Sequence, residues 1–408
     1  MKAMKWLIVS FMLVLGLAVP VSAEEETYEE LSVKEKHRLL TEIAIEEDIP
    51  PEILKAIAAG ENNMMQFSED GTVLETDDGG IGMMQVTNHD FEGVNKARLA
   101  TDTEYNIKIG ADILNKKWDQ FAKSSTLPTV NGASNRDILE QWYFAIMAYN
   151  GYSNKNNPLR DYEDGKKPYQ ENVYDNIKEF SRVSIADRPE FSFHLDDGFL
   201  VSDVKDYQWP EANSYTTQMF QPGDQVYVMN DENLSGENLD FGRLKSNEYF
   251  GGSEIDLIPY YTELEIVSGP YFPKENIYRH FVAYEVQSNH YNGYVASANL
   301  RSTDRMEKDF DPKDDPMTDV SLDKVWKIKM NISIDPATVN ERNVYIVSDD
   351  GKGVRIDLSL SSDQTMITAT PEGEYDKGTE YALYVKGLKS TEGEPLRTNV
   401  FREFRTVN

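Results

Sequence analysis

Apolar residues recur with the period of an α-helix through residues 30–182. Two capping-box patterns, from Ser32 to Glu35 and from Thr101 to Glu104, each mark the start of a helix. After the second pattern, apolar side chains return every three or four residues for about five turns, at Ile107, Ala111, Leu114, Trp118 and Phe121. The pattern predicts a mainly α-helical domain, which we place at residues 24–182.

The helical period ends near residue 183, and short strand-like stretches follow. They lie at residues 225–229, 264–267, 280–286 and 293–296, and Gly, Pro and Asn residues separate them. Such stretches are typical of small all-β domains. We therefore expect a small β-barrel at residues 221–303, joined to the helical domain by a connector at residues 183–220.

Two further segments complete the predicted order. Residues 304–318 are charged and contain few large apolar side chains, so we interpret them as an acidic linker; calcium binding by their Asp residues is the less favoured alternative. In residues 319–408 apolar and polar side chains alternate, as at Trp326, Ile328 and Met330, which predicts a β-sandwich. The expected fold is multidomain: a mainly α domain, a small β-barrel and a C-terminal β-sandwich.

Charge and cysteine content exclude several functions. The chain has 71 Asp and Glu against 41 Lys and Arg, a net charge of −30, so nucleic acid and anionic lipid are poor partners. It has no Cys, which excludes disulfides, thiolate nucleophiles, Cys-based zinc sites and iron–sulfur clusters. The five His residues stand in no close metal-ligand spacing, so we expect no metal and no cofactor.

The first 23 residues have the features of a secretory signal sequence. Lys2 and Lys5 precede an apolar run at residues 6–19, which is shorter than the roughly 20 residues needed to span a bilayer. Val21 and Ala23 suit the expected cleavage point. We expect a secreted protein without stable membrane insertion; an uncleaved N-terminal anchor is the alternative.

One glutamate lies on an apolar helix face. Pro51 suits the first turn of a helix, and Ile53, Ile57 and Glu61 follow at intervals of four on one side of it. Desolvation and the negative end of the helix dipole both raise the pKa of a carboxyl group in such a position. A carboxyl that keeps its proton near neutral pH is suited to protonate a glycosidic oxygen. The alternative, which periodicity alone favours, is that the helix reaches solvent at Glu61.

Three later segments carry polar or aromatic residues at predicted turns and helix ends. Residues 79–86 are Gly-rich and contain Gln85, but they lack the Lys and the spacing of a phosphate loop, which disfavours nucleotide binding. The Ala-Tyr-Asn-Gly run at residues 148–151 ends an amphipathic helix, and Tyr169 lies four residues before Val173 in the last helix. Taken singly, these are equally well a Gly turn, a helix cap and a core Tyr.

In this order the segments resemble the soluble lytic transglycosylase domain of the lysozyme superfamily, over residues 40–182. The matching motifs are Glu61-Asn62, Gly82-Met83-Met84-Gln85, Ala148-Tyr149-Asn150-Gly151 and Tyr169. The resemblance implies a secreted, cell wall-associated enzyme that acts on peptidoglycan glycan strands. It would cleave the bond between N-acetylmuramic acid and N-acetylglucosamine and form a 1,6-anhydro sugar.

The same resemblance implies roles for individual residues. Glu61 would be the catalytic acid and base, and Tyr169 would orient Glu61 or the substrate. The implied substrate cleft is lined by Asn62, Met84, Gln85, Tyr149 and Asn150.

Departures from the family pattern leave alternatives open. Asn62 stands where the family usually has Ser, which changes the hydrogen-bonding geometry toward the substrate. Asp77 and Asp78 could hold a water molecule, as in goose-type lysozymes, and make the protein a hydrolytic lysozyme; a solvated acidic turn is the plainer interpretation. An inactive wall-binding surface protein is disfavoured, because Glu61 and Gln85 are retained together with the Tyr-Asn pair.

The β regions resemble two surface modules. Residues 222–228, 263–267 and 293–301 resemble a bacterial Src-homology-3-like domain, and residues 319–408 resemble the bacterial Ig-like domain of surface-layer proteins. These resemblances imply wall peptides or surface polymers as further partners, with inert spacers as the alternative. Because every candidate catalytic residue precedes Ala186, we expect a chain truncated there to stay active.

Overall fold

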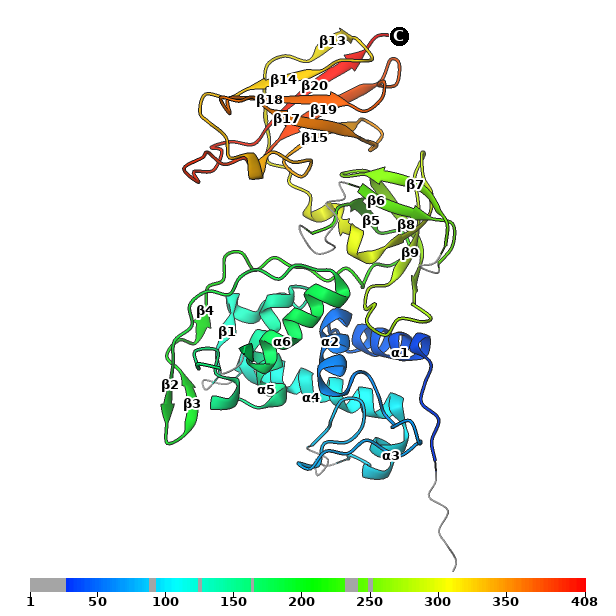
Figure 1. The fold of residues 1–408 in the computed structure, drawn as a ribbon, viewed down its shortest axis with the longest axis vertical. Helices are drawn as coiled ribbons and strands as arrows, with labels where there is room; N and C mark the ends of the chain where they lie inside the picture. Colours follow the sequence, from blue (N-terminus) through cyan, green and yellow to red (C-terminus); the bar gives the residue numbers. More distant parts are fainter. Residues whose placement is uncertain (1–26, 88–92, 124–126, 163–164, 232–240, 249–251) are drawn as a thin grey trace, which may run out of the picture.

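The computed structural model describes residues 27–87, 93–123, 127–162, 165–231, 241–248 and 252–408. The signal sequence expected at residues 1–23 lies outside them. Among these residues, no helix is both long and apolar enough to cross a membrane. The chain passes from a helical domain at its N-terminal end into two β regions (Figure 1). This order confirms the prediction of a mainly helical part followed by mostly β structure.

The helical domain is built from α1 (Val33–Glu46), α2 (Pro51–Asn62), α3 (Lys96–Thr101), α4 (Thr103–Lys123), α5 (Tyr143–Asn150) and α6 (Tyr169–Asn176). Helix α6 continues into a π-helical turn, η5 (Ile177–Ser181). At the start of α1 the Ser32 side chain accepts a hydrogen bond from the Glu35 N–H (3.3 Å), as the capping box predicts. Before α4 the acceptor is instead the Asp102 carboxylate, which takes the Tyr105 N–H (3.0 Å), because Thr101 is still part of α3.

A lobe of turns joins α2 to α3. The lobe is held together by isolated β-bridges, which join Phe67 to Val73, Glu75 to Ile81 and Ile81 to Val86. The Glu30 carboxylate fixes its base by accepting the N–H groups of Gln66 (2.8 Å) and Phe67 (2.7 Å). The lobe thereby holds the Gly-rich segment against the helices.

The segment at residues 183–220, expected to be a connector, packs into the helical domain. It contains the hairpin of β2 (Phe193–Asp196) and β3 (Phe199–Ser202). Its next strand, β4 (Asp206–Tyr207), pairs in parallel with β1 (Thr129–Val130) of the helical domain. Main-chain hydrogen bonds therefore tie the segment to the domain that precedes it.

Side chains of the same segment complete the helical core. Phe191, Tyr207 and Trp209 are buried in the same hydrophobic cluster as α5. The ring centroids of Phe191 and Tyr143 of α5 lie 5.0 Å apart. Aromatic residues contribute much of the apolar area that a core buries, so this segment is a structural part of the helical domain.

The next region, which we call the middle β domain, lies above α1 and α2 in Figure 1. Its strands are β5 (Gln225–Val228), β6 (Phe241–Lys245), β7 (Glu254–Pro259), β8 (Glu263–Tyr271), β9 (Ala283–Gln287), β10 (Asn292–Ala296) and β11 (Leu300–Ser302). They form one sheet in the order β11-β5-β8-β9-β10-β6-β7, and neighbouring strands are antiparallel. Alternate side chains of these strands build a separate hydrophobic cluster.

The C-terminal region has two sheets around a third hydrophobic cluster. One sheet contains β12 (Asp311–Pro312), β13 (Met317–Val320), β15 (Val344–Ser348), β16 (Gly353–Val354), β19 (Glu380–Val385) and β20 (Val400–Thr406). The other contains β14 (Trp326–Lys329), β17 (Ile356–Leu360) and β18 (Met366–Pro371). As the alternation predicts, Trp326 is buried while Lys327 and Lys329 are exposed.

Residues 304–318 differ from the solvated linker that their composition predicts. Strand β12 and the first residues of β13 lie in this segment and pair in parallel with β20. Such pairing uses main-chain groups, so charged and Pro-containing sequence can join a sheet edge without apolar side chains.

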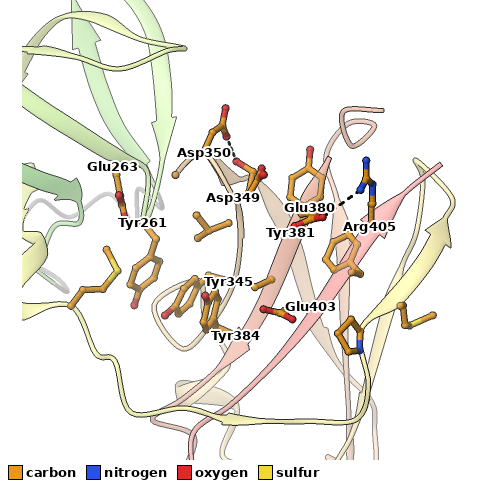
Figure 2. Close-up of a pocket in the computed structure, with 18 of the residues that line it drawn as sticks. Tyr261, Glu263, Tyr345, Asp349, Asp350, Glu380, Tyr381, Tyr384, Glu403 and Arg405 are labelled. Carbon is orange, nitrogen blue, oxygen red and sulfur yellow. Dashed lines mark hydrogen bonds and ion pairs between the residues drawn. The ribbon is translucent and has the colours of Figure 1, made fainter. Parts of the chain in front are cut away.

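The two β regions contact each other directly. The Tyr261 hydroxyl donates to the Arg342 carbonyl (2.6 Å), and the Glu263 N–H donates to the Gly351 carbonyl (2.8 Å). Figure 2 shows Tyr261 of the middle β domain beside Tyr345 of the C-terminal region, with ring centroids 3.5 Å apart. A cleft of about 830 Å³ lies along this junction, and none of the predicted site residues lines it.

Candidate active site

Glu61 lies in the last turn of α2, and left-handed residues directly after it end the helix. Asn63 (φ 49°) and Met64 (φ 56°) both take left-handed conformations, and their N–H groups bond back to the carbonyls of Ala59 and Ala58. This is a common way for a helix to end, and Asn is among the residues that tolerate it. The termination leaves Glu61 half-buried at the end of the apolar face that begins at Ile53.

Tyr169 holds the Glu61 carboxyl group. It is the first residue of α6, and its hydroxyl donates a hydrogen bond to Glu61 Oε1 (2.6 Å) across 108 residues of sequence. Burial raises the pKa of the Tyr169 hydroxyl well above its ordinary value, and the nearby Glu61 carboxylate raises it further. The phenol therefore stays protonated at neutral pH and remains a hydrogen-bond donor there.

Burial raises the pKa of Glu61 above its ordinary value. The Tyr169 hydrogen bond and the Lys155 ammonium group oppose this rise, while the Asp78 carboxylate adds to it. The net direction is upward because desolvation of the ionised carboxylate is the largest contribution. Glu61 is thus held in an environment that favours a proton-donating carboxyl group.

The Gly82–Gln85 turn is fixed by two fully buried amides, those of Gln66 and Asn106. Gln66 Oε1 accepts the Met83 N–H (2.9 Å), and Asn106 Oδ1 accepts the Met84 N–H (2.9 Å). Gly82 has φ +73°, and a Cβ there would lie within 2.5 Å of the Gln66 and Asn106 amides. Only Gly can therefore bring the turn this close.

Sequence reasoning missed Gln66 and did not single out Asn106 for a role. Both amides make hydrogen bonds that span 17 to 34 residues, to Met83, Met84, Leu99, Ala100 and Ile81. A polar residue with distant partners has no periodic signal, so only an aligned set of related sequences could have pointed to them.

Tyr149 and Met84 join the turn to the end of α5. The Tyr149 hydroxyl donates to the Met84 carbonyl oxygen (2.8 Å), and burial raises the pKa of that hydroxyl well above its ordinary value. The Met84 side chain is wholly buried, and a Cβ at Gly110 would lie 2.7 Å from it. Met84 therefore packs in the core, whereas the resemblance implies that it lines the cleft.

The three amides among the predicted site residues differ in their surroundings. Asn62 Nδ2 donates to the Met65 carbonyl (3.0 Å), and Asn150 Oδ1 accepts from Asn156 (3.1 Å), so each makes an internal hydrogen bond. Gln85 Nε2 donates to the Gly82 carbonyl (2.8 Å), while its Oε1 atom is buried without a hydrogen-bond partner among the described residues.

Asp78 and Lys155 contribute charge near Glu61. The Thr76 hydroxyl donates to Asp78 Oδ1 (2.6 Å), and this hydrogen bond lowers the pKa of the exposed Asp78 carboxyl, which is therefore ionised. The Asp78 and Lys155 charges act on Glu61 in opposite directions. Lys155, which was not predicted, lies in a single 3-10 turn (Asn154–Asn156) shortly after the Asn150 motif. Among the described residues, no group of three or more His, Asp or Glu side chains is arranged to hold a metal ion.

Comparison with known protein families agrees with this geometry. Residues 38–171 match the family model of the transglycosylase SLT domain, and residues 308–406 match that of a bacterial Ig-like domain. The match supports a relation of the helical part of the chain to lytic transglycosylases and lysozyme-like cell wall enzymes, a family for which peptidoglycan is the implied substrate. The match to the bacterial Ig-like domain begins inside the predicted linker and covers the C-terminal region.

Two solved structures show how far such matches extend along the chain. Domains 1–6 of the surface layer protein SbsC match with 20% identity over 22% of this chain and 13% of that chain, at a TM-score of 0.20. CopC from Methylosinus trichosporium OB3b matches with 17% identity over 23% of this chain and 85% of that chain, also at 0.20. The chain spans 13% to 23% of the SbsC structures it matches. No curated protein matches it.

Proposed function

We propose that this protein is a secreted peptidoglycan lytic transglycosylase that acts at the cell wall. It cleaves the bond between N-acetylmuramic acid and N-acetylglucosamine and leaves a 1,6-anhydro end. The observation that carries the proposal is the half-buried Glu61 carboxyl at the end of α2, held by the Tyr169 hydroxyl at 2.6 Å within a transglycosylase SLT domain.

The proposed reaction needs one carboxyl group. Protonated Glu61 gives its proton to the glycosidic oxygen as the bond from that oxygen to the anomeric carbon breaks. The Glu61 carboxylate then takes the proton of the sugar's own 6-hydroxyl as this oxygen bonds to the anomeric carbon. The proton returns to Glu61 and no water is consumed, so the second carboxylate of ordinary glycosidases is not required. The Tyr169 hydrogen bond stabilises the transient carboxylate.

Mass analysis of the fragments released from purified wall tests the proposal, because anhydro products are lighter than hydrolysed ones by one water. A zymogram on the same material distinguishes an active transglycosylase or lysozyme from an inactive wall-binding protein. Anhydro ends as the main product support the proposal, and an absence of any cleavage by folded protein contradicts it.

Replacing Tyr169 with Phe tests how the carboxyl group is held. The change removes one of the influences that lower the pKa of Glu61, so we expect that pKa to rise and the alkaline limb of the pH–rate profile to move to higher pH. A hydrogen bond to a charged group contributes about 1.5–3 kcal/mol, so kcat is expected to fall by at least about ten-fold. Tyr174→Phe is the matched control, since this hydroxyl on the same helix bonds to the Leu139 carbonyl (2.9 Å).

A hydrolytic lysozyme is the second candidate, because Asp78 is ionised and acts on Glu61. If Asp78 positions a water, Asp78→Asn should suppress hydrolysed products selectively. Under the transglycosylase mechanism we expect the variant to keep its anhydro products and to show a lower pKa for Glu61, since a charge that raises it is lost. Product masses and the pH–rate profile measure the two effects, with Asp77→Asn as the control. If Asp78→Asn loses activity and the wild type releases hydrolysed products, the result favours the lysozyme.

The β regions are proposed to keep the enzyme at the wall. In this proposal the middle β domain is a Src-homology-3-like barrel, and the C-terminal region is an Ig-like sandwich of the surface-layer type. Their proposed ligands are wall peptides or surface polymers. Two hydrophobic clusters separate from the helical core, each with its own sheets, support the assignment of two modules.

A further inference from the structure

Helix α2 carries two charged side chains that have no contact with solvent. Glu52 and Lys55 both have 0% exposure, although they lie near the start of the helix that ends at Glu61. Charged side chains are almost never fully buried unless they are paired, because the loss of hydration costs more than most contacts return. The partners of these two residues therefore show what holds α2 in place.

Those partners come from far along the chain. The Glu52 carboxylate accepts hydrogen bonds from the Thr216 hydroxyl (2.8 Å) and the Thr217 N–H (2.8 Å). The Lys55 ammonium group donates to Gln218 Oε1 (2.6 Å) and to the carbonyl oxygen of His280 (2.8 Å). Residues 216–218 lead into the middle β domain, and His280 lies in the loop before β9, so every one of these bonds ties α2 to residues outside the matched catalytic family segment.

The middle β domain is itself tied to the helical domain at the same place. The His280 N–H donates to the Phe180 carbonyl in η5 (3.0 Å), and the Thr217 hydroxyl lies 3.4 Å from that of Ser297. The ring of His280 packs against that of His37 in α1, with centroids 5.8 Å apart. Elements α1, α2, η5 and the middle β domain thus meet in one buried polar junction.

We propose that the middle β domain, together with residues 216–218 that lead into it, positions the catalytic helix, and that Lys55 and Glu52 are the positioning residues through which these contacts act on Glu61. The inference rests on the proposed function of Glu61. With a rise of about 1.5 Å per residue, Lys55 lies roughly 9 Å from Glu61 along one rigid helix. A tilt at the junction therefore displaces the Glu61 carboxyl relative to Tyr169, which reaches it from α6. The middle β domain thereby affects catalysis by fixing the position of α2, in addition to any wall binding.

The junction brings several ionisable groups together without solvent. They are His37 from α1, Glu52 and Lys55 from α2, and His280 and Tyr284 from the middle β domain. Burial lowers the pKa of Lys55 from 10.5 to about 7, against the opposing Glu52 charge. Between these values the unfolded chain binds more protons at Lys55 than the folded one, so this group makes stability rise as pH rises.

The test compares full-length Lys55→Met with Lys108→Met, which alters an exposed lysine on α4 of the same domain. Met keeps the length and the apolar stem of Lys55 but leaves Gln218 Oε1 and the His280 carbonyl without their donor. We expect kcat on soluble peptidoglycan glycan to fall by about ten-fold, since a displacement of about 1 Å at a catalytic group can cost up to a hundred-fold. KM should change by less than about two-fold, because the sugar-binding groups are untouched. Lys108→Met should behave as wild type.

Two readouts separate positioning from simple loss of folded protein. The pKa of Glu61, measured by NMR of its labelled carboxyl carbon, should fall in Lys55→Met, because a displaced α2 exposes that carboxyl to water. The stability of this variant should also lose the rise between pH 7 and 10.5 that Lys55 produces in the wild type. Both readouts are independent of turnover. The Glu61 pKa tests the positioning role even if the wild type cleaves no glycan and the proposed function fails, and the pH-dependent stability checks that Lys55 is the group that titrates at the junction.

Thr217→Val is the second test variant, to be used if Lys55→Met does not fold. It keeps the shape of Thr217 and its N–H bond to Glu52 but removes the hydroxyl that bonds to Glu52 (3.1 Å) and to Ser297. We expect a smaller effect in the same direction on kcat and on the pKa of Glu61. A folded Lys55→Met, or a folded Thr217→Val in its place, with wild-type kcat and wild-type Glu61 pKa overturns the proposal.

Discussion

Glu61→Gln is expected to abolish cleavage of purified cell wall while leaving the protein folded. The Gln side chain has nearly the shape of the protonated Glu, and its carbonyl oxygen can still accept the Tyr169 hydroxyl at Oε1. It cannot deliver a proton to the glycosidic oxygen, and a general acid contributes about 10²–10⁴-fold to rate. We therefore expect residual activity below about one per cent, measured as soluble glycan released from walls.

The same variant should be at least as stable as the wild type at neutral and alkaline pH. The pKa of Glu61 is raised in the folded protein, so the wild type loses stability as pH rises through that pKa and the buried carboxyl must ionise. Gln carries no such charge, and the loss should be absent from pH-dependent thermal unfolding. Glu46→Gln, at an exposed position on α1, is the control for loss of charge alone. Retention of more than a few per cent of activity in folded Glu61→Gln would show that another group is the acid.

Truncation after Ala186 is expected to unfold the helical domain and abolish activity, whereas truncation after Ser302 is expected to keep both. This replaces the expectation from the sequence alone, because the structure places essential core residues after the first cut. Loss of a buried Phe or Trp side chain alone costs about 3–5 kcal/mol. The first truncation removes several buried residues, among them Phe191, Tyr207 and Trp209, and a whole domain is stable by only about 5–15 kcal/mol.

Polar contacts make the same cut more damaging. The shorter fragment leaves the buried carboxylates of Glu52 and Glu140 without Thr216, Thr217 and Ser214, which satisfy them in the whole protein. The longer fragment retains all of these contacts; it loses the C-terminal region and residues 303–318, among them Arg305, whose guanidinium forms an ion pair with Asp137 (3.3 Å). Circular dichroism melting and wall cleavage of the two purified fragments measure the outcome. A well-folded and active fragment ending at Ala186 would contradict the role assigned to residues 187–220.

Patterns within one element were readable from the sequence. The helical period of residues 30–182 and the alternation after residue 319 predict the α and β regions, because side chains three or four apart on a helix, or two apart on a strand, share one face. The same periodicity places Glu61 at the end of an apolar stripe, and the structure has it half-buried there. The Ser32 cap at α1 is another local feature that needs no distant partner.

Contacts between distant elements were decided only by the tertiary structure. The Tyr169 hydroxyl donates a hydrogen bond to Glu61, 108 residues away in the sequence. The Lys55 ammonium group donates one to the His280 carbonyl, 225 residues away. In the sequence, Glu52 and Lys55 are indistinguishable from solvent-exposed charges, since hydrophobic periodicity reports apolar faces and is silent on polar side chains that become buried. The strand β12 could not be predicted for a related reason. Its pairing with β20 depends on main-chain hydrogen bonds, which residues of every type can form, except that the Pro nitrogen has no hydrogen to donate. The candidate acid is thus determined by its own helix, while its pKa, its hydrogen bond and its support depend on chain segments that only folding brings together.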